Sequence, residues 1–185
     1  MSLTKEHQQR MLDIAKSSIQ HGFQTGKALK INLADYPAEL TERRATFVTL
    51  HKHHQLRGCI GMLEAVRPLA EDIAENAFLA AFRDPRFPPL AEDEFGDLDI
   101  HLSILTPAEP VAFTSEQDLI AQLQPGVDGL ILEEGRRRGT FLPSVWEQLP
   151  EPEQFLRHLK QKAGLAPDYW SENIKIFRYR TEMIG

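Results

Sequence analysis

The segment Leu98–Ile104 constrains the fold more than any other part of the sequence. Its four apolar residues alternate strictly with Asp99, His101 and Ser103. A period of two is typical of a strand that buries one face and leaves the other polar. Such strands usually belong to antiparallel sheets, since parallel strands tend to be apolar on both faces. Five further stretches are β-prone, at 45–50, 56–63, 129–133, 139–142 and 174–179. Residues 51–55 are expected to connect the first two as a hairpin, and a glycine- and arginine-rich turn is expected to connect 129–133 to 139–142 as a second hairpin.

Helical periodicity separates these strands. Four helices are predicted, and they begin near Thr4, Pro68, Ser115 and Pro152. Gly22 is expected to end the first helix, and three prolines in Asp84–Pro89 must end the second. Because strands and helices follow no strict βαβ order, the sequence predicts an α+β fold with a mostly antiparallel β-sheet flanked by helices.

Size and charge narrow the class of protein. A chain of 185 residues fits one domain, or two small lobes that share a core. Its net charge of -6 argues against a nucleic-acid partner, because binding to phosphates relies on Lys and Arg. The run Arg136–Arg138 is too short for a basic motif and is interpreted as a solvated turn.

The same survey indicates a cytoplasmic location and no membrane association. The N-terminal ten residues are polar and lack the apolar centre of a signal peptide. No stretch approaches the roughly 18 consecutive apolar residues of a membrane span. The single cysteine excludes an internal disulfide and suits a reducing compartment.

That cysteine lies in the segment Leu56-Arg57-Gly58-Cys59-Ile60-Gly61. Arg57 lies two positions before Cys59, so regular strand geometry would place both side chains on one face, where a guanidinium favours the reactive thiolate. Gly58 and Gly61 would let backbone or ligand approach closely. The alternative is a buried, inert cysteine.

A catalytic thiol also needs a base, which must come from elsewhere in the fold. His101, on the polar face of its strand, is the candidate for proton transfer. His51 and His53 could join Cys59 in a metal site, but the chain has no CxxC or HExxH pattern, so no metal is predicted. No motif predicts an organic cofactor either.

The segment Asp84-Pro85-Arg86-Phe87 is the second candidate site. Prolines would hold Asp84 and Arg86 in a stiff loop, and a fixed arginine can bind a carboxylate or phosphate through two hydrogen bonds. Alternatively the loop is a structural clamp, in which Asp84 pairs with Arg86 and Phe87 fills the core.

These segments resemble a known family. The six residues at 56–61 are followed in order by Asp84–Leu90, Ser103–Pro107, Asp128–Leu130, Leu142-Pro143 and Lys162–Leu165, and the ordered set resembles the AMMECR family. The resemblance covers the chain from about residue 45 to 185 and implies a single AMMECR-type domain over 1–185, with two unequal lobes. It also implies that this protein is similar to the first component of the prokaryotic AmmeMemoRadiSam set, beside a Memo-like and a radical-SAM protein.

The resemblance carries no settled activity, so two hypotheses stay open. In the first, the chain is an enzyme or enzyme subunit acting on a small anionic substrate. Cys59 and His101 would be catalytic, and Arg57, Gly58, Gly61, Asp84 and Arg86 would form the binding site. In the second, the chain is a non-catalytic binding or adaptor protein that works with the Memo-like and radical-SAM partners.

Overall fold

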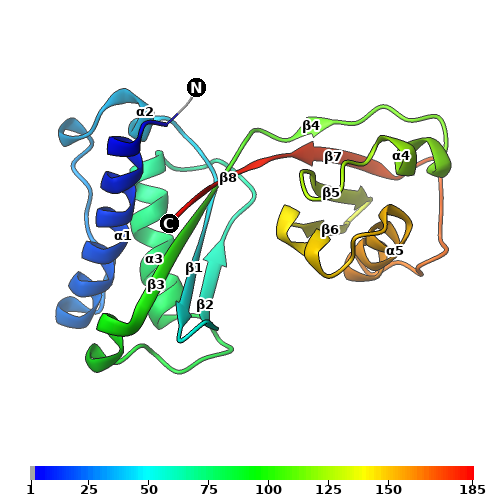
Figure 1. Cartoon of the computed structure of the whole chain (residues 1–185). Coiled ribbons are helices and arrows are strands. Elements are labelled where there is room, and N and C mark those ends of the chain that lie inside the picture. The colour runs from blue at the N-terminus through cyan, green and yellow to red at the C-terminus, as the bar shows by residue number, and fades with distance from the viewer. Residues whose placement is uncertain (1–2) are drawn as a thin grey trace. The chain divides into compact units, whose positions relative to one another are not determined.

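A computed structural model describes residues 3–185 of the chain. These residues form an α+β fold, as predicted, which divides into two compact units (Figure 1). Unit 1 comprises Met1–Leu105 with Glu182–Gly185, and unit 2 comprises Thr106–Thr181. Whether the two units act as a single AMMECR-type domain stays a prediction. No helix in the described part of the chain is both long and apolar enough to cross a membrane.

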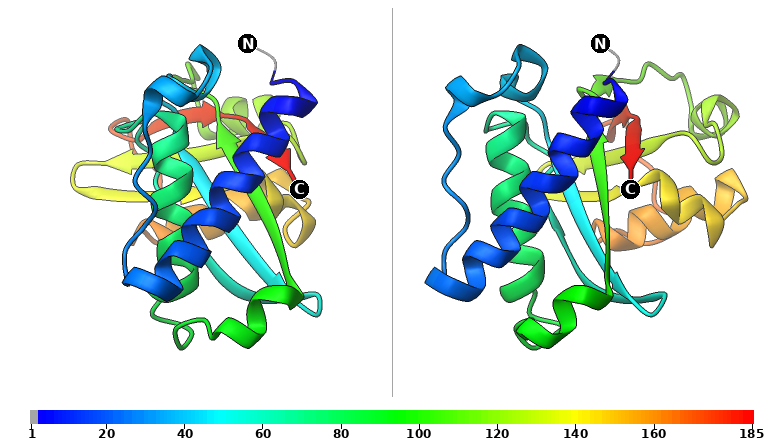
Figure 2. Two further views of the ribbon diagram at one scale, coloured as in Figure 1. Left: turned by 90° about the vertical axis from the view of Figure 1, so that its left-hand side faces the viewer. Right: turned by 60° about the vertical axis from the view of Figure 1, so that its left-hand side comes forward.

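Unit 1 is a sheet with helices on one face. Its four strands lie in the order β2-β1-β3-β8, with β1 antiparallel to both of its neighbours. Helices α1 and α3 lie side by side across one face (Figure 2). The elements are α1 Lys5–Thr25, η1 Leu33–Asp35, α2 Ala38–Thr41, β1 Thr46–Lys52, β2 Gln55–Gly61, α3 Leu69–Phe82, η2 Glu92–Asp97, β3 Leu98–Leu105 and β8 Thr181–Ile184.

The core of unit 1 lies between this sheet and the two helices. Strand β1, which was expected from its β-prone residues, alternates in burial, with Val48 and Leu50 fully buried beneath the helices. Helix α3 is apolar on most of its surface, which is typical of a helix enclosed by other elements. Burial of these side chains supplies most of the stability of the unit.

The prediction that Gly22 ends the first helix is wrong. Helix α1 continues to Thr25 and ends at Gly26, whose φ of 71° is the left-handed conformation that glycine adopts readily. Gly22 instead lies against α3, where a Cβ atom would come within 2.4 Å of the ring of Phe82. The glycine therefore permits close helix packing and does not terminate the helix.

The hairpin between β1 and β2 is tighter than the expected loop 51–55. Only His53 and His54 connect the strands, with φ values of 50° and 65°. Positive φ at both central residues is the geometry of a type I′ turn. The ladder then carries a β-bulge, because Leu50 pairs with Gly58 whereas His51 pairs with Leu56. Arg57 is the extra residue of this bulge.

Unit 2 has its own antiparallel sheet, in the order β4-β7-β5-β6, and its own core around Trp146 and Phe155. The interpretation of Arg136–Arg138 as a turn is only partly right. Gly135 and Arg136 form the turn, whereas Arg137 and Arg138 belong to β6, and Arg138 pairs with Glu133. The elements are β4 Glu109–Pro110, α4 Glu116–Gln122, β5 Gly129–Glu134, β6 Arg137–Phe141, η3 Pro143–Glu147, α5 Pro152–Lys162 and β7 Lys175–Tyr179.

Candidate functional site

The motif at 56–61 forms strand β2, which lies at the edge of the sheet of unit 1. Gly58 packs against the C-terminal turn of α3, where a Cβ atom would lie 2.1 Å from the carbonyl oxygen of Ala80. At Gly61 a Cβ atom would lie 2.4 Å from the backbone oxygen of Thr46. Both glycines therefore allow close contact within the protein. These contacts explain why glycine occupies both positions, without the predicted role in ligand binding.

The second motif covers the outer edge of β2. The N–H of Cys59 donates to Oδ2 of Asp84 over 3.0 Å, and Nη2 of Arg86 donates to the Cys59 carbonyl over 3.3 Å. An edge strand otherwise leaves such groups open to water or to another chain. The two motifs, 25 residues apart in sequence, thus form one hydrogen-bonded assembly that holds the backbone of Cys59. We call it the Cys59 clamp.

Within the clamp, Asp84 and Arg86 form a bidentate pair. Nε of Arg86 donates to Oδ1 of Asp84 over 3.0 Å, and Nη2 donates to Oδ2 over 2.7 Å. This pairing, with help from the N–H groups of Cys59 and Arg86, outweighs burial and holds the pKa of Asp84 well below its usual range. The same hydrogen bond raises the pKa of Arg86. Only 2% of the Asp84 side chain is exposed, against 55% for Arg86, so the positive group faces solvent.

The Cys59 side chain lies on the face of the sheet opposite the helices. It is half-buried, and its Sγ is 3.3 Å from Oγ1 of Thr49. Thr49 is also the direct cross-strand neighbour of His101, so the three residues form a row across β2, β1 and β3. The predicted base is therefore one residue beyond the hydroxyl that contacts the thiol. Sequence reasoning missed Thr49, although its place opposite Cys59 follows from the hairpin register.

His101 has two further neighbours. Its Nδ1 lies 2.8 Å from the oxygen of Gly185, which fixes the ring. The ring of His51 meets it edge-on, with 5.4 Å between the ring centroids. Among residues 3–185 no group of three or more His, Cys, Asp or Glu is arranged to hold a metal ion.

Arg57 does not share a face with Cys59, contrary to the expectation. The bulge interrupts the alternation of β2, and Arg57 donates to Glu94 over 3.0 Å and 3.3 Å. Lys52 reaches the same carboxylate over 3.1 Å. Because Lys52 is three residues from Thr49 on β1, it belongs to the face opposite the thiol. Hydrogen bonds from Arg57, from the Ala91 N–H and from Lys52 lower the pKa of Glu94 to about 2.

With this geometry established, the chain can be compared with known proteins. The sequence model of the AMMECR1 family matches residues 12–184. The chain belongs to the AMMECR1 family. The match begins well before residue 45, so the N-terminal helix α1 is also part of the family's domain.

Individual relatives agree with this assignment. A protein from Methanothermobacter thermautotrophicus is 38% identical over 183 residues, which cover 98% of this chain and 95% of the relative. Protein MJ0810 from Methanocaldococcus jannaschii is 40% identical over 158 residues, covering 83% and 79%. The crystal structure titled "Uncharacterized Protein PH0010" from Pyrococcus horikoshii superposes with a TM-score of 0.88 at 34% identity, covering 98% of this chain and 92% of that one.

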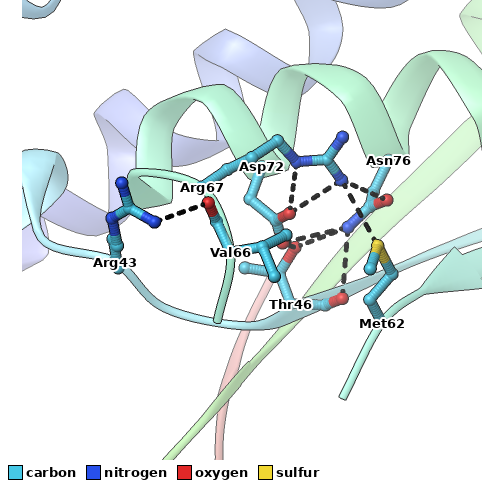
Figure 3. Close-up of polar contacts among 7 residues, drawn as sticks. All are labelled: Arg43, Thr46, Met62, Val66, Arg67, Asp72 and Asn76. Atoms are coloured by element: carbon cyan, nitrogen blue, oxygen red, sulfur yellow. Dashed lines mark hydrogen bonds and ion pairs between the residues drawn. The ribbon is translucent and has the colours of Figure 1, made fainter. Parts of the chain in front are cut away.

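In this AMMECR1-family protein a buried polar cluster adjoins the end of β2 (Figure 3). Asp72 is fully buried and accepts hydrogen bonds from Thr46 over 2.6 Å and from Arg67 over 2.8 Å. Asn76, also fully buried, donates to Thr46 and to Asp72. The cluster ties α3 to the first residue of β1, beside Gly61. Sequence reasoning missed it, because Asp72 and Asn76 read as ordinary polar positions of a helix.

Proposed function

We propose that the protein binds a small anionic substrate beside Cys59 and acts as an enzyme, or as a subunit of one, with the Cys59 thiolate as the reacting group. One observation carries this proposal: a buried carboxylate, that of Asp84, fixes the exposed guanidinium of Arg86 at the backbone of Cys59. A free thiol as reacting group requires a reducing compartment, so we also propose a cytoplasmic location.

The arrangement of charges around Cys59 supports the binding of an anion. Asp84 is buried and Arg86 is half-exposed, so the pair presents its positive end to solvent. The hydrogen bonds of Arg86 use Nε and Nη2, and they leave Nη1 for a ligand. Because Asp84 already fixes the guanidinium, little side-chain entropy is lost when a carboxylate or phosphate binds.

Further roles follow from the row across the sheet. The Thr49 hydroxyl would donate its hydrogen bond to the Cys59 thiolate, and His101 would exchange protons with substrate in front of the strands. Arg57, bound to Glu94, would add positive potential from the far side of the loop. Gly58 and Gly61 would act indirectly, by keeping β2 close to α3 and β1.

Two alkylating reagents of similar size test the proposal. Iodoacetate is an anion and iodoacetamide is neutral, so the ratio of their rates at Cys59 measures anion attraction at the thiol. Arg86→Gln should lower this ratio about fivefold, the effect of the roughly 1 kcal/mol that two unit charges 4 Å apart retain in water. Any loosening of the Cys59 clamp accelerates both reagents and largely cancels in the ratio.

Arg83→Gln is the matched control. Arg83 is an exposed arginine at the end of α3, only three residues from Arg86, and its removal changes the net charge equally. The ratio should be unchanged in this variant. An equal effect of the two substitutions, or no effect of Arg86→Gln, would refute anion binding beside Cys59.

The second candidate is an adaptor that works with Memo-like and radical-SAM partners. It is favoured by the exposure of Pro85, Pro88 and Pro89 on a loop that the clamp makes rigid. Co-purification with these two partners distinguishes the candidates. An adaptor keeps its partners after Cys59→Ser and loses them after Pro88→Ser with Pro89→Ser. If all variants behave alike, this loop is not the docking surface.

A further inference from the structure

Arg57 has an unsatisfied donor. Its Nε and Nη2 both bind Glu94, but Nη1 is buried and has no hydrogen-bond partner within residues 3–185. Only 11% of the side chain is exposed. A buried charged group with an unpaired N–H is energetically unfavourable. Lys52 adds to the imbalance, since two cations share the single carboxylate of Glu94.

The ring of Phe87 lies against this guanidinium. The ring centroid is 5.9 Å from Cζ of Arg57 and 5.5 Å from Cζ of Arg86. Phe87 is half-buried, yet it is absent from the hydrophobic cluster that forms the described core of unit 1. The earlier alternative that Phe87 fills the core therefore does not explain its position. The two cations next to the ring of Phe87, Arg57 and Arg86, both belong to the candidate site.

The backbone at Phe87 is held firmly. The N–H of Phe87 donates to the carbonyl of Asp84 over 3.1 Å, and the N–H of Arg86 donates to the Asp84 carboxylate over 3.1 Å. Pro88 and Pro89 follow directly and restrict the chain. With the backbone held in this way, the ring of Phe87 can change its position through rotation about its side-chain bonds, with no movement of the loop.

We propose that Phe87 is a gate between Arg57 and Arg86, and that the ligand of the opened site is a compact dianion. One end of the ligand would bind Arg86 and the other would bind Nη1 of Arg57. Within the described residues, the ion pairs of Lys52, Arg57 and Arg86 are made with two carboxylates, those of Glu94 and Asp84, so these pairs together carry one net positive charge. A phosphate and a short dicarboxylate share this chemistry. The inference rests on the proposed function and adds a second anion-binding residue to it.

Binding of inorganic phosphate and of malonate to the full chain, measured separately by isothermal titration calorimetry, tests the gate. Phe87→Ala should tighten binding of at least one of the two dianions about tenfold, equivalent to about 1.4 kcal/mol. Adding Arg57→Gln should abolish the gain. The dianion whose affinity increases, phosphate or malonate, identifies the class of the ligand. Tyr36→Ala is the matched control, because it removes a half-buried ring from Arg10, far from the motif in sequence.

The outcomes separate cleanly. A gain in Phe87→Ala that needs Arg57 supports the gate. No gain for either probe, a gain that survives Arg57→Gln, or an equal gain in Tyr36→Ala would overturn it. Phe87→Leu, which keeps an apolar side chain but has no aromatic face, gives the same test should the alanine variant fail to fold. The effect of Arg86→Gln on the alkylation ratio at Cys59 is independent of this result, so the gate can fail while the proposed function stands.

Discussion

Replacing Gly58 with alanine should destabilise unit 1 strongly. The new Cβ atom would lie 2.1 Å from the carbonyl oxygen of Ala80, whereas real Cβ atoms essentially never come closer than 3.0 Å to such a neighbour. Strand β2 and helix α3 must therefore separate by about 0.9 Å, the difference between these two distances. The oxygen that the new Cβ atom would meet belongs to the backbone of a helix, so rotation of a side chain cannot relieve the clash.

The magnitude follows from the cost of overpacking. Extra methyl groups in tight sites cost about 1–3 kcal/mol, and a clash with backbone belongs at the upper end. Alanine regains about 0.4–1 kcal/mol by restricting the unfolded chain. The free energy of unfolding should therefore fall by about 2–2.6 kcal/mol. Gly96→Ala is the matched control, because a Cβ atom at Gly96 has no neighbour within 4 Å, and its effect should stay within about 0.5 kcal/mol.

Urea denaturation followed by far-ultraviolet circular dichroism measures the difference. With a slope of about 1–3 kcal/mol per molar urea, the midpoint for Gly58→Ala should fall by about 0.7–2.6 M. Trp146 and Trp170 both belong to unit 2, so tryptophan fluorescence follows that unit separately. A Gly58→Ala variant as stable as Gly96→Ala would refute the close approach of β2 and α3.

Three other perturbations test the remaining electrostatic features. The pKa of Glu94 is held at about 2, against an ordinary value of 4.5, so its ionised form stabilises the folded protein above pH 4.5 and this stability is lost as the pH falls toward 2. Glu94→Gln should therefore reduce the fall in the free energy of unfolding that is measured between pH 4.5 and pH 2. Asp72→Ala should lower the free energy of unfolding, measured in urea, by about 3–5 kcal/mol, because it removes the buried carboxylate that pairs with Arg67. Glu71→Ala, one residue away, is the control and should lower it by less than about 1 kcal/mol. Burial raises the pKa of Tyr179 to about 12, so Tyr179→Phe should remove the last step of tyrosine ionisation seen by ultraviolet absorbance, and an unchanged last step would contradict the assignment.

The regular parts of the fold could be predicted because local patterns specify them. The alternation of Leu98–Ile104 predicted β3, and the prolines at 85–89 marked the end of α3. Two short strands, β4 and β8, were missed. Each has four residues or fewer, too few to show a period. Gly22 was misjudged because a glycine at a helix crossing and a glycine at a helix end look alike in sequence.

The site was only partly predictable, since its geometry depends on contacts between distant segments. The sequence alone singled out Cys59, Asp84 and Arg86 as candidates, and the structure brings these three residues together; pairing of Asp84 with Arg86 was one of the alternatives considered. The place of the bulge at Arg57 could not be foreseen, because the glycines at 58 and 61 indicate only that the strand is irregular and the shift appears in its pairing with β1. Glu94 likewise carried no signal, since a carboxylate in an acidic stretch, Glu92–Glu94, reads as a solvated residue.

The Cys59 clamp bears directly on the choice between enzyme and adaptor. Edge strands often bind partners by adding a strand, and this requires open N–H and C=O groups. At Cys59 both groups are already occupied, by Asp84 and Arg86. A partner strand could pair there only by displacing a bidentate ion pair whose carboxylate is buried. The side chain of Cys59, in contrast, is only partly buried, and its Sγ contacts the Thr49 hydroxyl on the face of the sheet opposite the helices. The clamp therefore occupies the backbone groups of Cys59 but makes no hydrogen bond to its side chain, which favours chemistry with a small ligand over addition of a partner strand at this position.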